Sequence, residues 1–190
     1  LRRSRGLGDV YKRQHIKIDI IVQDANNLPE GCKINSKREK PWGTAHAIWC
    51  AKNYVSGDFA IINADDFYGK NSFKNAFQYM SRKDNNKNFG LVCYKLSETL
   101  SEFGSVSRGV CKVENDKLVS INEYLKIQQE NNIIFDLNTE KTLHEDDLVS
   151  MNFWICKNNF FIFLEIYIIR CIRAVSFTHL RAHETFANLG

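Results

Sequence analysis

An apolar segment that ends in two adjacent carboxylates constrains the fold of this chain more than any other feature. Residues 58–64 have the pattern of a strand, and Asp65 and Asp66 follow where that strand should reach the surface. A continuous apolar run indicates a strand buried on both faces, as in a largely parallel sheet. In open α/β sheets, ligands bind at the carboxyl ends of such strands. The acidic pair is therefore expected at a binding edge.

Two interpretations of this pair remain open on the residues alone. Neighbouring carboxylates repel, so a partly buried pair favours a cation beside it, above all Mg²⁺ with its preference for oxygen ligands. Adjacent strand residues point to opposite sides, so one carboxylate is expected to bind the metal and the other to orient the loop or a ligand hydroxyl. Alternatively, the pair caps the turn or helix that follows, where aspartate is common.

Strand and helix patterns alternate through the first half of the chain. Residues 15–24 alternate as a strand does, and Thr44 is the expected N-cap of a helix that extends to Val55. Further segments are a helix from about residue 72, strands at 89–96 and 149–155, a hairpin at 109–124 around Asn115-Asp116, and a helix from about Asn158. This order predicts a layered α/β fold with a largely parallel sheet.

Charge and cysteine usage argue against several function classes. Residues 1–14 contain five basic residues and one acidic residue, which accounts for the whole formal net charge of +4. Residues 15–173 are therefore neutral and carry no basic patch for nucleic acid. The six cysteines include no CxxC pair and no secretory signal is evident, which indicates a reduced, cytoplasmic protein. The apolar run at 160–169 is too short to span a membrane and contains Glu165.

Both ends of the chain resemble peptides translated from sequencing-adapter DNA at the edges of assembled reads, such as metagenomic ones. LRRSRGLGDVYKRQ at 1–14 is interpreted as a non-native leader, and residues 174–190, with VSFTHLRAHET, as a non-native tail. Residues 15–173 then form one partial domain. His179 and His183 have the spacing of a helical zinc pair, but they lie in this tail and lack the usual glutamate, so no metal is assigned to them.

A glycine directly before a helix marks a second candidate segment, KPWGTAHA at 40–47. Gly43 would let a ligand approach the backbone, and the helix N-terminus would offer N–H groups to an anion or a base edge. Taken alone, this segment is better explained as an ordinary capped helix start. It becomes informative beside the acidic pair, because a single helix separates the two segments.

The order QD, LPEG, KPWGTAHA, AIINADDFYG, SRGVCKV, INEY and VSMNFW closely resembles the sugar-nucleotidyltransferase family over about residues 15–166. The resemblance implies a Rossmann-like three-layer α/β/α fold with a mixed, mostly parallel sheet, incomplete at its N-terminus. It also implies a Mg²⁺-dependent reaction that joins an NTP to a sugar 1-phosphate and releases pyrophosphate. A related acceptor such as phosphocholine and a homo-oligomeric assembly stay open.

The same resemblance implies a role for each matching residue. Asp65 would be the catalytic magnesium ligand that bridges the phosphates, and Asp66 its polar neighbour near the ribose or sugar. The other expected positions are Gln23, Gly43 and Thr44 on the nucleotide, and Gly109, Glu123, Lys126 and Asn152 on the acceptor.

Three departures from the family pattern bear on activity. The Gly-rich triphosphate loop is absent, no second metal-binding aspartate is evident after residue 155, and INEYLKIQ replaces the adjacent Glu-Lys pair of better-known members. The chain as given is therefore expected to be inactive. Two other functions are weighed: a glycosyltransferase that uses a preformed nucleotide sugar, and a non-catalytic regulatory module that binds one.

Overall fold

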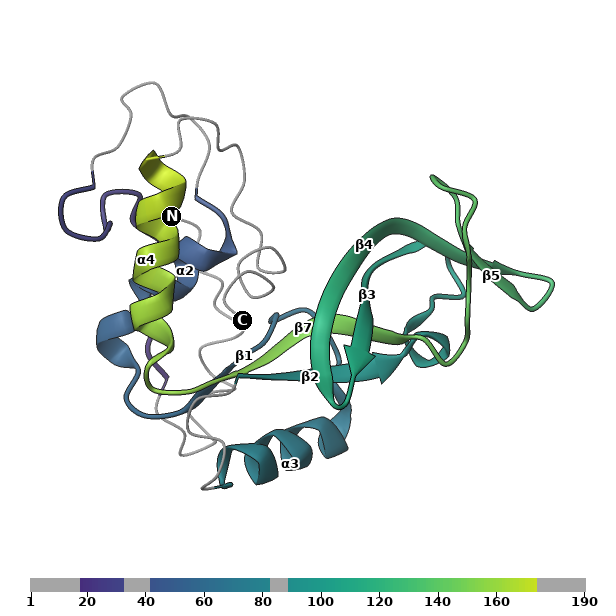
Figure 1. Ribbon diagram of the computed structural model, residues 1–190, viewed down its shortest axis with the longest axis horizontal. Coiled ribbons are helices and arrows are strands. Elements are labelled where there is room, and N and C mark those ends of the chain that lie inside the picture. Colours follow the sequence, from purple (N-terminus) through teal and green to yellow (C-terminus); the bar gives the residue numbers. More distant parts are fainter. Residues whose placement is uncertain (1–17, 33–41, 83–88, 174–190) are drawn as a thin grey trace, which may run out of the picture.

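A curved antiparallel sheet with helices at one end forms the structure, a computed structural model that describes residues 18–32, 42–82 and 89–173 (Figure 1). The expected leader and tail, and the first two residues of the 40–47 segment, lie outside the described residues. The elements are α2 (Thr44–Cys50), η1 (Lys52–Tyr54), β1 (Phe59–Ile61), α3 (Gly69–Met80), β2 (Gly90–Lys95), η3 (Leu96–Thr99), β3 (Val106–Glu114), β4 (Lys117–Glu130), β5 (Ile133–Asp136), β6 (Thr142–Leu143), β7 (Leu148–Cys156) and α4 (Phe160–Arg173).

The seven-stranded sheet is organised around β7. β1 and β2 pair with opposite edges of this strand, because Ile61 and Leu91 have the same partner, Trp154. β2 and β3 also take opposite edges, because both reach Ser150. β1 and β3 therefore share one edge of β7, and β4, β5 and β6 follow β3 in order.

The expectation of a mostly parallel sheet is wrong for the described part of the chain, where every strand pairing is antiparallel. β1 and β2 do run in the same direction, but β7 lies between them and runs the opposite way. From β3 to β6, consecutive strands are joined by short connections, which permit only antiparallel pairing. The coarser expectation of a mixed α/β fold is confirmed.

The strand expected at residues 15–24 does not form in its described part, residues 18–24. Ile20 and Val22 are 92% and 79% exposed. The backbone makes local turns instead, with the Asp24 amide donating to the Val22 carbonyl at 2.9 Å. A strand needs a hydrogen-bonded neighbour to be stable, and none pairs with this segment among the described residues.

The hairpin expected around Asn115-Asp116 is confirmed as the β3–β4 turn. Glu114 pairs with Lys117, so two residues form the loop. Both have positive φ, 50° for Asn115 and 60° for Asp116. A type I′ turn requires this conformation at both central residues, and asparagine and aspartate tolerate it.

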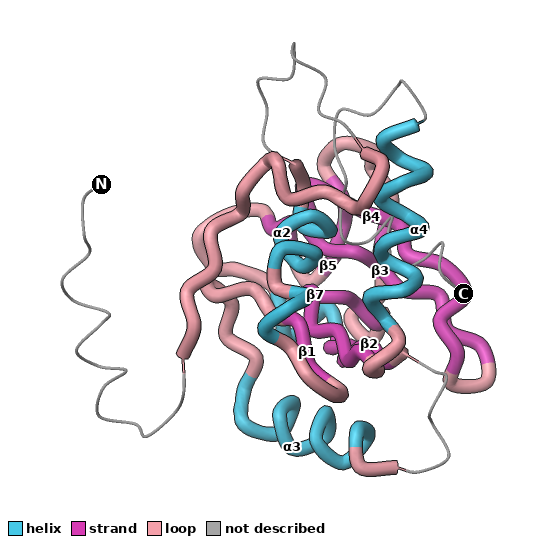
Figure 2. Tube along the Cα trace, turned by 90° about the vertical axis from the view of Figure 1, so that its left-hand side faces the viewer, coloured by secondary structure: helices cyan, strands magenta, loops and turns pink. Residues whose placement is uncertain are grey.

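Helices cover both faces of the central strand, as the two views in Figures 1 and 2 agree. Trp154 and Cys156 pack with residues of α2 and α4, whereas Phe153 and Ile155 pack with residues of α3. Successive strand residues point to opposite faces, so β7 anchors a helical layer on each side. No helix of the described part is long and apolar enough to cross a membrane.

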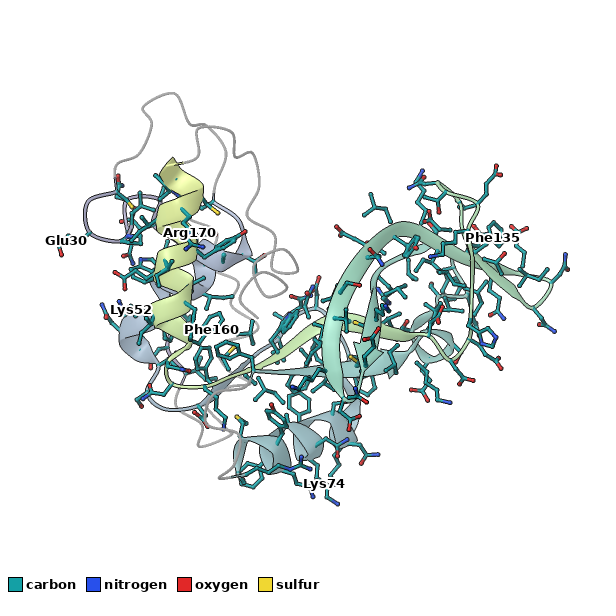
Figure 3. The ribbon with its side chains drawn as sticks, viewed as in Figure 1. Glu30, Lys52, Lys74, Phe135, Phe160 and Arg170 are labelled. Carbon is teal, nitrogen blue, oxygen red and sulfur yellow. The ribbon has the colours of Figure 1, made fainter. Side chains whose placement is uncertain are left out.

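A separate core lies under the curved half of the sheet. Phe160, at the start of α4, belongs to the core beneath the helices, while Phe135 on β5 lies at the opposite end of the molecule (Figure 3). The buried members of this second core are Leu96, Ile127, Ile134, Leu143 and Val149.

Candidate functional site

A break in one edge of β7 creates the candidate site. β1 pairs with this edge only at residues 154–156, and β3 only at residues 149–150. Residues 151–153 lie between these two pairings, and the loop at 62–68 leaves β1 at this position. We call this position the β7 gap. The geometry explains why the acidic pair follows a strand: the strand ends where its sheet edge is interrupted.

Tyr68 fastens the acidic loop across the β7 gap. Its hydroxyl accepts from the Asn63 amide at 2.9 Å and donates to the Met151 carbonyl at 2.9 Å. Asp66 Oδ2 lies 3.3 Å from the same hydroxyl and accepts from Asn63 Nδ2 at 2.8 Å. Burial and the neighbouring Asp66 raise the pKa of Tyr68 to about 12, so this phenol stays protonated as a donor at neutral pH.

The two carboxylates of the acidic pair have different surroundings. Asp66 is half-buried and bonded within the loop, as described above, whereas Asp65 is exposed. Asp66 thus orders the loop, one of the two expected roles. Binding of a metal by the other carboxylate stays a prediction. The alternative role of a helix cap does not apply to α3, whose N-cap is Tyr68 without a side-chain bond.

Asn152 occupies a distorted position inside the gap. Its φ is 62°, a conformation in which asparagine is among the better-tolerated non-glycine residues. The β2–β7 register shifts between Leu91 and Cys93, opposite this residue. Its Oδ1 is buried without a hydrogen-bond partner among the described residues. Uncommon backbone conformations and unsatisfied polar atoms both concentrate at functional sites.

Arg108 is a residue of this site that the sequence reasoning missed. Its Nη1 donates to the Ser107 carbonyl at 2.8 Å and its Nη2 to the Thr99 carbonyl at 2.7 Å. Its Nε is buried and has no partner in the described part of the chain. Burial lowers the pKa of Arg108, and the negative charge of Asp66 opposes that shift. Arginine still remains charged at all relevant pH values. The signal available in the sequence was an arginine directly before Gly109.

The expected acceptor residues on β3 and β4 lie on the side of the gap where β3 pairs with β7. Gly109 is buried and lies in register between Glu123 of β4 and Ser150 of β7. Glu123 and Lys126 are exposed on β4. The Lys126 backbone amide donates to Asp136 Oδ1 at 3.1 Å, which ties this part of β4 to the end of β5. The structure thus brings Gly109 and Glu123 together, with Lys126 three residues further along β4.

The expected nucleotide residues form a second cluster at the start of α2. Gln23 Nε2 donates to the carbonyls of Trp42 (2.7 Å) and Gly43 (3.3 Å) and lies 3.2 Å from His46 Nδ1. Gln23 and Gly43 are therefore brought together as expected. The helix boundary was not predicted correctly: Gly43 occupies the N-cap, and Thr44 is the exposed first residue of α2.

His46, in the first turn of α2, is buried against the 23–27 turn. It is 0% exposed, and its Nε2 lies 2.8 Å from the Asn27 carbonyl. Together with the bonds of Gln23, this contact holds the 23–27 turn against α2. The nucleotide cluster thus consists of a loop held against the start of a helix. Gly43 has no side chain there, so a ligand could approach the backbone.

The donor set at the acidic pair fits only a magnesium ion that is shared with a substrate. No group of three histidine, cysteine, aspartate or glutamate residues in the described part of the chain could hold a metal by itself. Mg²⁺ commonly keeps several waters and binds through one or two carboxylates plus substrate phosphates. Asp65, exposed beside the loop that Asp66 orders, can supply such a carboxylate.

Comparisons with known proteins identify the family and several relatives of this chain. A family model described as nucleotidyl transferase matches residues 5–161. A 60-residue segment is 38% identical to "Bifunctional protein GlmU" of Methanococcus vannielii and 37% identical to that of Methanococcus maripaludis. The segment covers 29% of this chain and 14% of each relative, so the match concerns a small part of those longer proteins.

Proposed function

The chain belongs to the nucleotidyl transferase family, and from this premise we propose that it transfers a nucleotidyl group from an NTP to a sugar 1-phosphate. The products are a nucleotide sugar and pyrophosphate. One observation carries the proposal: at the β7 gap an exposed carboxylate follows β1, an asparagine oxygen is buried without a partner among the described residues, and a buried glycine lies in the adjoining β3–β7 pairing. The helical layers on both faces of β7 support a three-layer α/β/α arrangement of this part.

In the proposed reaction, an oxygen of the acceptor phosphate attacks the α-phosphorus of the NTP. The bond from this phosphorus to the bridging oxygen of pyrophosphate breaks, and the electron pair leaves with pyrophosphate. No covalent intermediate with the protein is needed, so alignment and charge neutralisation supply the rate enhancement. A bound Mg²⁺, held by Asp65 and by phosphate oxygens, would neutralise charge that develops on those oxygens.

The residues of the chain itself position the two substrates. Gln23 uses its amide nitrogen to hold the backbone at Gly43, which leaves its amide oxygen to accept from the nucleotide base. Thr44 offers the exposed start of α2 to the same nucleotide. Asp66 keeps the acidic loop in place through Asn63 and lies near the ribose or sugar.

The acceptor is proposed to bind between β3, β4 and β7. Gly109 allows a sugar ring to approach the backbone, since it has no side chain. Glu123 accepts hydrogen bonds from sugar hydroxyls, and Lys126 faces the acceptor phosphate. Asn152 supplies its buried Oδ1 as a further acceptor.

Pyrophosphate release tests this function. The chain, produced with its natural flanking sequence, would be incubated with Mg²⁺, each NTP and a panel of sugar 1-phosphates, with phosphocholine included. We expect release that needs both substrates and that falls about 100-fold or more in Asp65→Asn, because one preorganised electrostatic contact typically contributes that much. Asp116→Asn, at the exposed tip of the β3–β4 turn, is the matched control and should retain full activity.

Other outcomes would identify the alternatives. Consumption of a preformed nucleotide sugar without pyrophosphate release would indicate a glycosyltransferase. Binding of nucleotide sugars by folded protein, with no release for any substrate pair, would indicate the non-catalytic module.

A further inference from the structure

Arg108 lies where the β7 gap opens. β3 pairs with β7 through Gly109–Ser150 and Val110–Val149, so Arg108 is the first residue of β3 beyond that pairing. Continuing the same register would place it opposite Met151, whose carbonyl accepts the Tyr68 hydroxyl instead. The other edge of Arg108 is used by β4, where its partner is Tyr124. Arg108 therefore borders the gap from the side opposite β1.

The guanidinium of Arg108 is held in a fixed direction but is not fully bonded. Two of its nitrogens donate to carbonyls, Nη1 to Ser107 and Nη2 to Thr99. Nε is buried with no partner in the described part of the chain. A guanidinium carries five N–H donors, and a buried donor without a partner is costly. A ligand that accepts hydrogen bonds here would remove that cost.

The charge of Arg108 identifies the kind of ligand. Asp66 is close enough to act on the guanidinium, but its Oδ2 already serves Asn63 and Tyr68. A planar, half-buried guanidinium with free donors matches the oxygens of a phosphate in both geometry and charge. An uncharged sugar hydroxyl would satisfy a donor but would not use the charge.

We infer that Arg108 binds the phosphate of the acceptor substrate and so determines that the acceptor must be phosphorylated. This inference rests on the proposed function. The acceptor phosphate is favoured over the NTP because Arg108 directly precedes Gly109 and lies on the β3–β4 side of the gap, whereas the nucleotide cluster lies at Gln23 and Gly43. Lys126 is then not the sole cation for this phosphate.

Calorimetric titration of the chain, and of the same chain with its natural flanking sequence, tests the inference. The probes are glucose 1-phosphate, phosphocholine, inorganic phosphate and each NTP with Mg²⁺. Arg108→Gln should weaken binding of the tightest phosphorylated acceptor probe about 10- to 100-fold, as expected for lost hydrogen bonds to a charged group. NTP affinity should change less than about 2-fold. Arg108→Lys keeps the charge without the planar fork and should lie between Arg108→Gln and the wild type.

Lys112→Gln is the matched control, because it removes one positive charge from the same strand. Lys112 is exposed and paired with Glu114 at 2.8 Å, and its replacement should leave every affinity unchanged.

Equal weakening of NTP and acceptor probes, or unchanged acceptor affinity in a folded Arg108 variant, would overturn the inference. So would a wild-type protein that binds no phosphorylated acceptor probe. Probe binding without pyrophosphate release would overturn the proposed reaction but leave the phosphate site. If Arg108→Gln does not fold, Arg108→Lys decides alone.

Discussion

Tyr68 holds together the loop that carries the acidic pair. Its ring packs against Phe153 of β7, with 5.2 Å between ring centroids, and its hydroxyl links the loop at 62–68 to Met151. The residue is 5% exposed. The loop is therefore held both by apolar packing and by a buried hydroxyl that bridges two chain segments.

Replacement of Tyr68 by phenylalanine should lower the free energy of unfolding by about 1–3 kcal/mol, because the Asn63 amide and the Met151 carbonyl lose their common partner. Urea denaturation measures the loss. Tyr54→Phe, at a tyrosine that is 63% exposed, is the control and should change little. A Tyr68→Phe protein as stable as the control would show that water replaces the hydroxyl.

The raised pKa of Tyr68 also predicts a pH dependence. Burial and the Asp66 charge shift this pKa from 10.0 to about 12. Below about pH 10, the folded and unfolded chains both keep the phenol proton. Between about pH 10 and pH 12, only the folded chain keeps it, so stability must fall as pH rises. Denaturation of wild type and Tyr68→Phe across this range should give a steeper fall for the wild type; parallel curves would contradict the shift.

The two neighbouring aspartates should respond differently to truncation. Asp66→Ala removes the acceptor of Asn63 Nδ2 and should destabilise the fold by about 1–2 kcal/mol. Asp65→Ala alters an exposed side chain and should change the stability by less than about 0.5 kcal/mol. Thermal unfolding of both variants provides the comparison. Equal losses would mean that Asp65 also supports the loop.

At the scale of elements, Asp136 fastens the turn that follows β5. The side chain is 1% exposed and accepts from the Thr139 amide and hydroxyl (both 2.9 Å) and from the Lys126 amide (3.1 Å). Burial raises the pKa of this carboxyl, but the hydrogen bonds from Thr139 and Lys126 outweigh it and lower the pKa below its ordinary value. The ionised form is therefore the one that stabilises the hairpin.

Asp136→Asn should reduce the unfolding free energy by about 1.5–3 kcal/mol at neutral pH, because a charged acceptor of three donors is lost. A lowered pKa contributes stability above the ordinary value of 3.8 and loses it as pH falls through the folded value. Wild type should therefore lose more stability than Asp136→Asn between neutral pH and about pH 3. Circular dichroism with urea at each pH follows both, and Asp116→Asn serves as the control. An Asp136→Asn loss equal to that control would contradict this role.

Local sequence signals predicted the elements better than their arrangement. The Asn115-Asp116 turn and the strand at 149–155 rest on local patterns, and both were predicted correctly. The strands that pair with β7 were not predicted, because the edge of β7 that each strand joins depends on residues far apart in the chain. Arg108 was missed for the same reason, because its position at the site depends on Thr99 and on where the β3–β7 pairing ends. Residues 18–24 have a strand pattern, yet pattern alone supplies no partner.

At the scale of the whole molecule, the Lys157–Asp58 pair joins segments that are far apart in the chain. Lys157 Nζ lies 2.7 Å from Asp58 Oδ2 and 3.3 Å from the carbonyl of Met80, the last residue of α3. The Asn158 amide donates to Asp58 Oδ1 at 3.1 Å. The pair thus connects the segment before β1, the end of α3 and the turn from β7 into α4. The two side chains are unequally buried, 4% exposed for Lys157 and 32% for Asp58.

This asymmetry predicts the order in which substitutions destabilise the molecule. Asp58→Asn keeps an oxygen for the Asn158 amide but leaves a buried ammonium without its counter-charge, which should cost about 3–5 kcal/mol. Lys157→Met leaves a carboxylate that water can reach, so we expect about 1–3 kcal/mol. The double variant should be more stable than Asp58→Asn alone, because no buried charge remains. Urea unfolding of the three proteins measures this order. If the Lys157→Met protein were less stable than Asp58→Asn, packing of the lysine stem, rather than its charge, would hold these segments together.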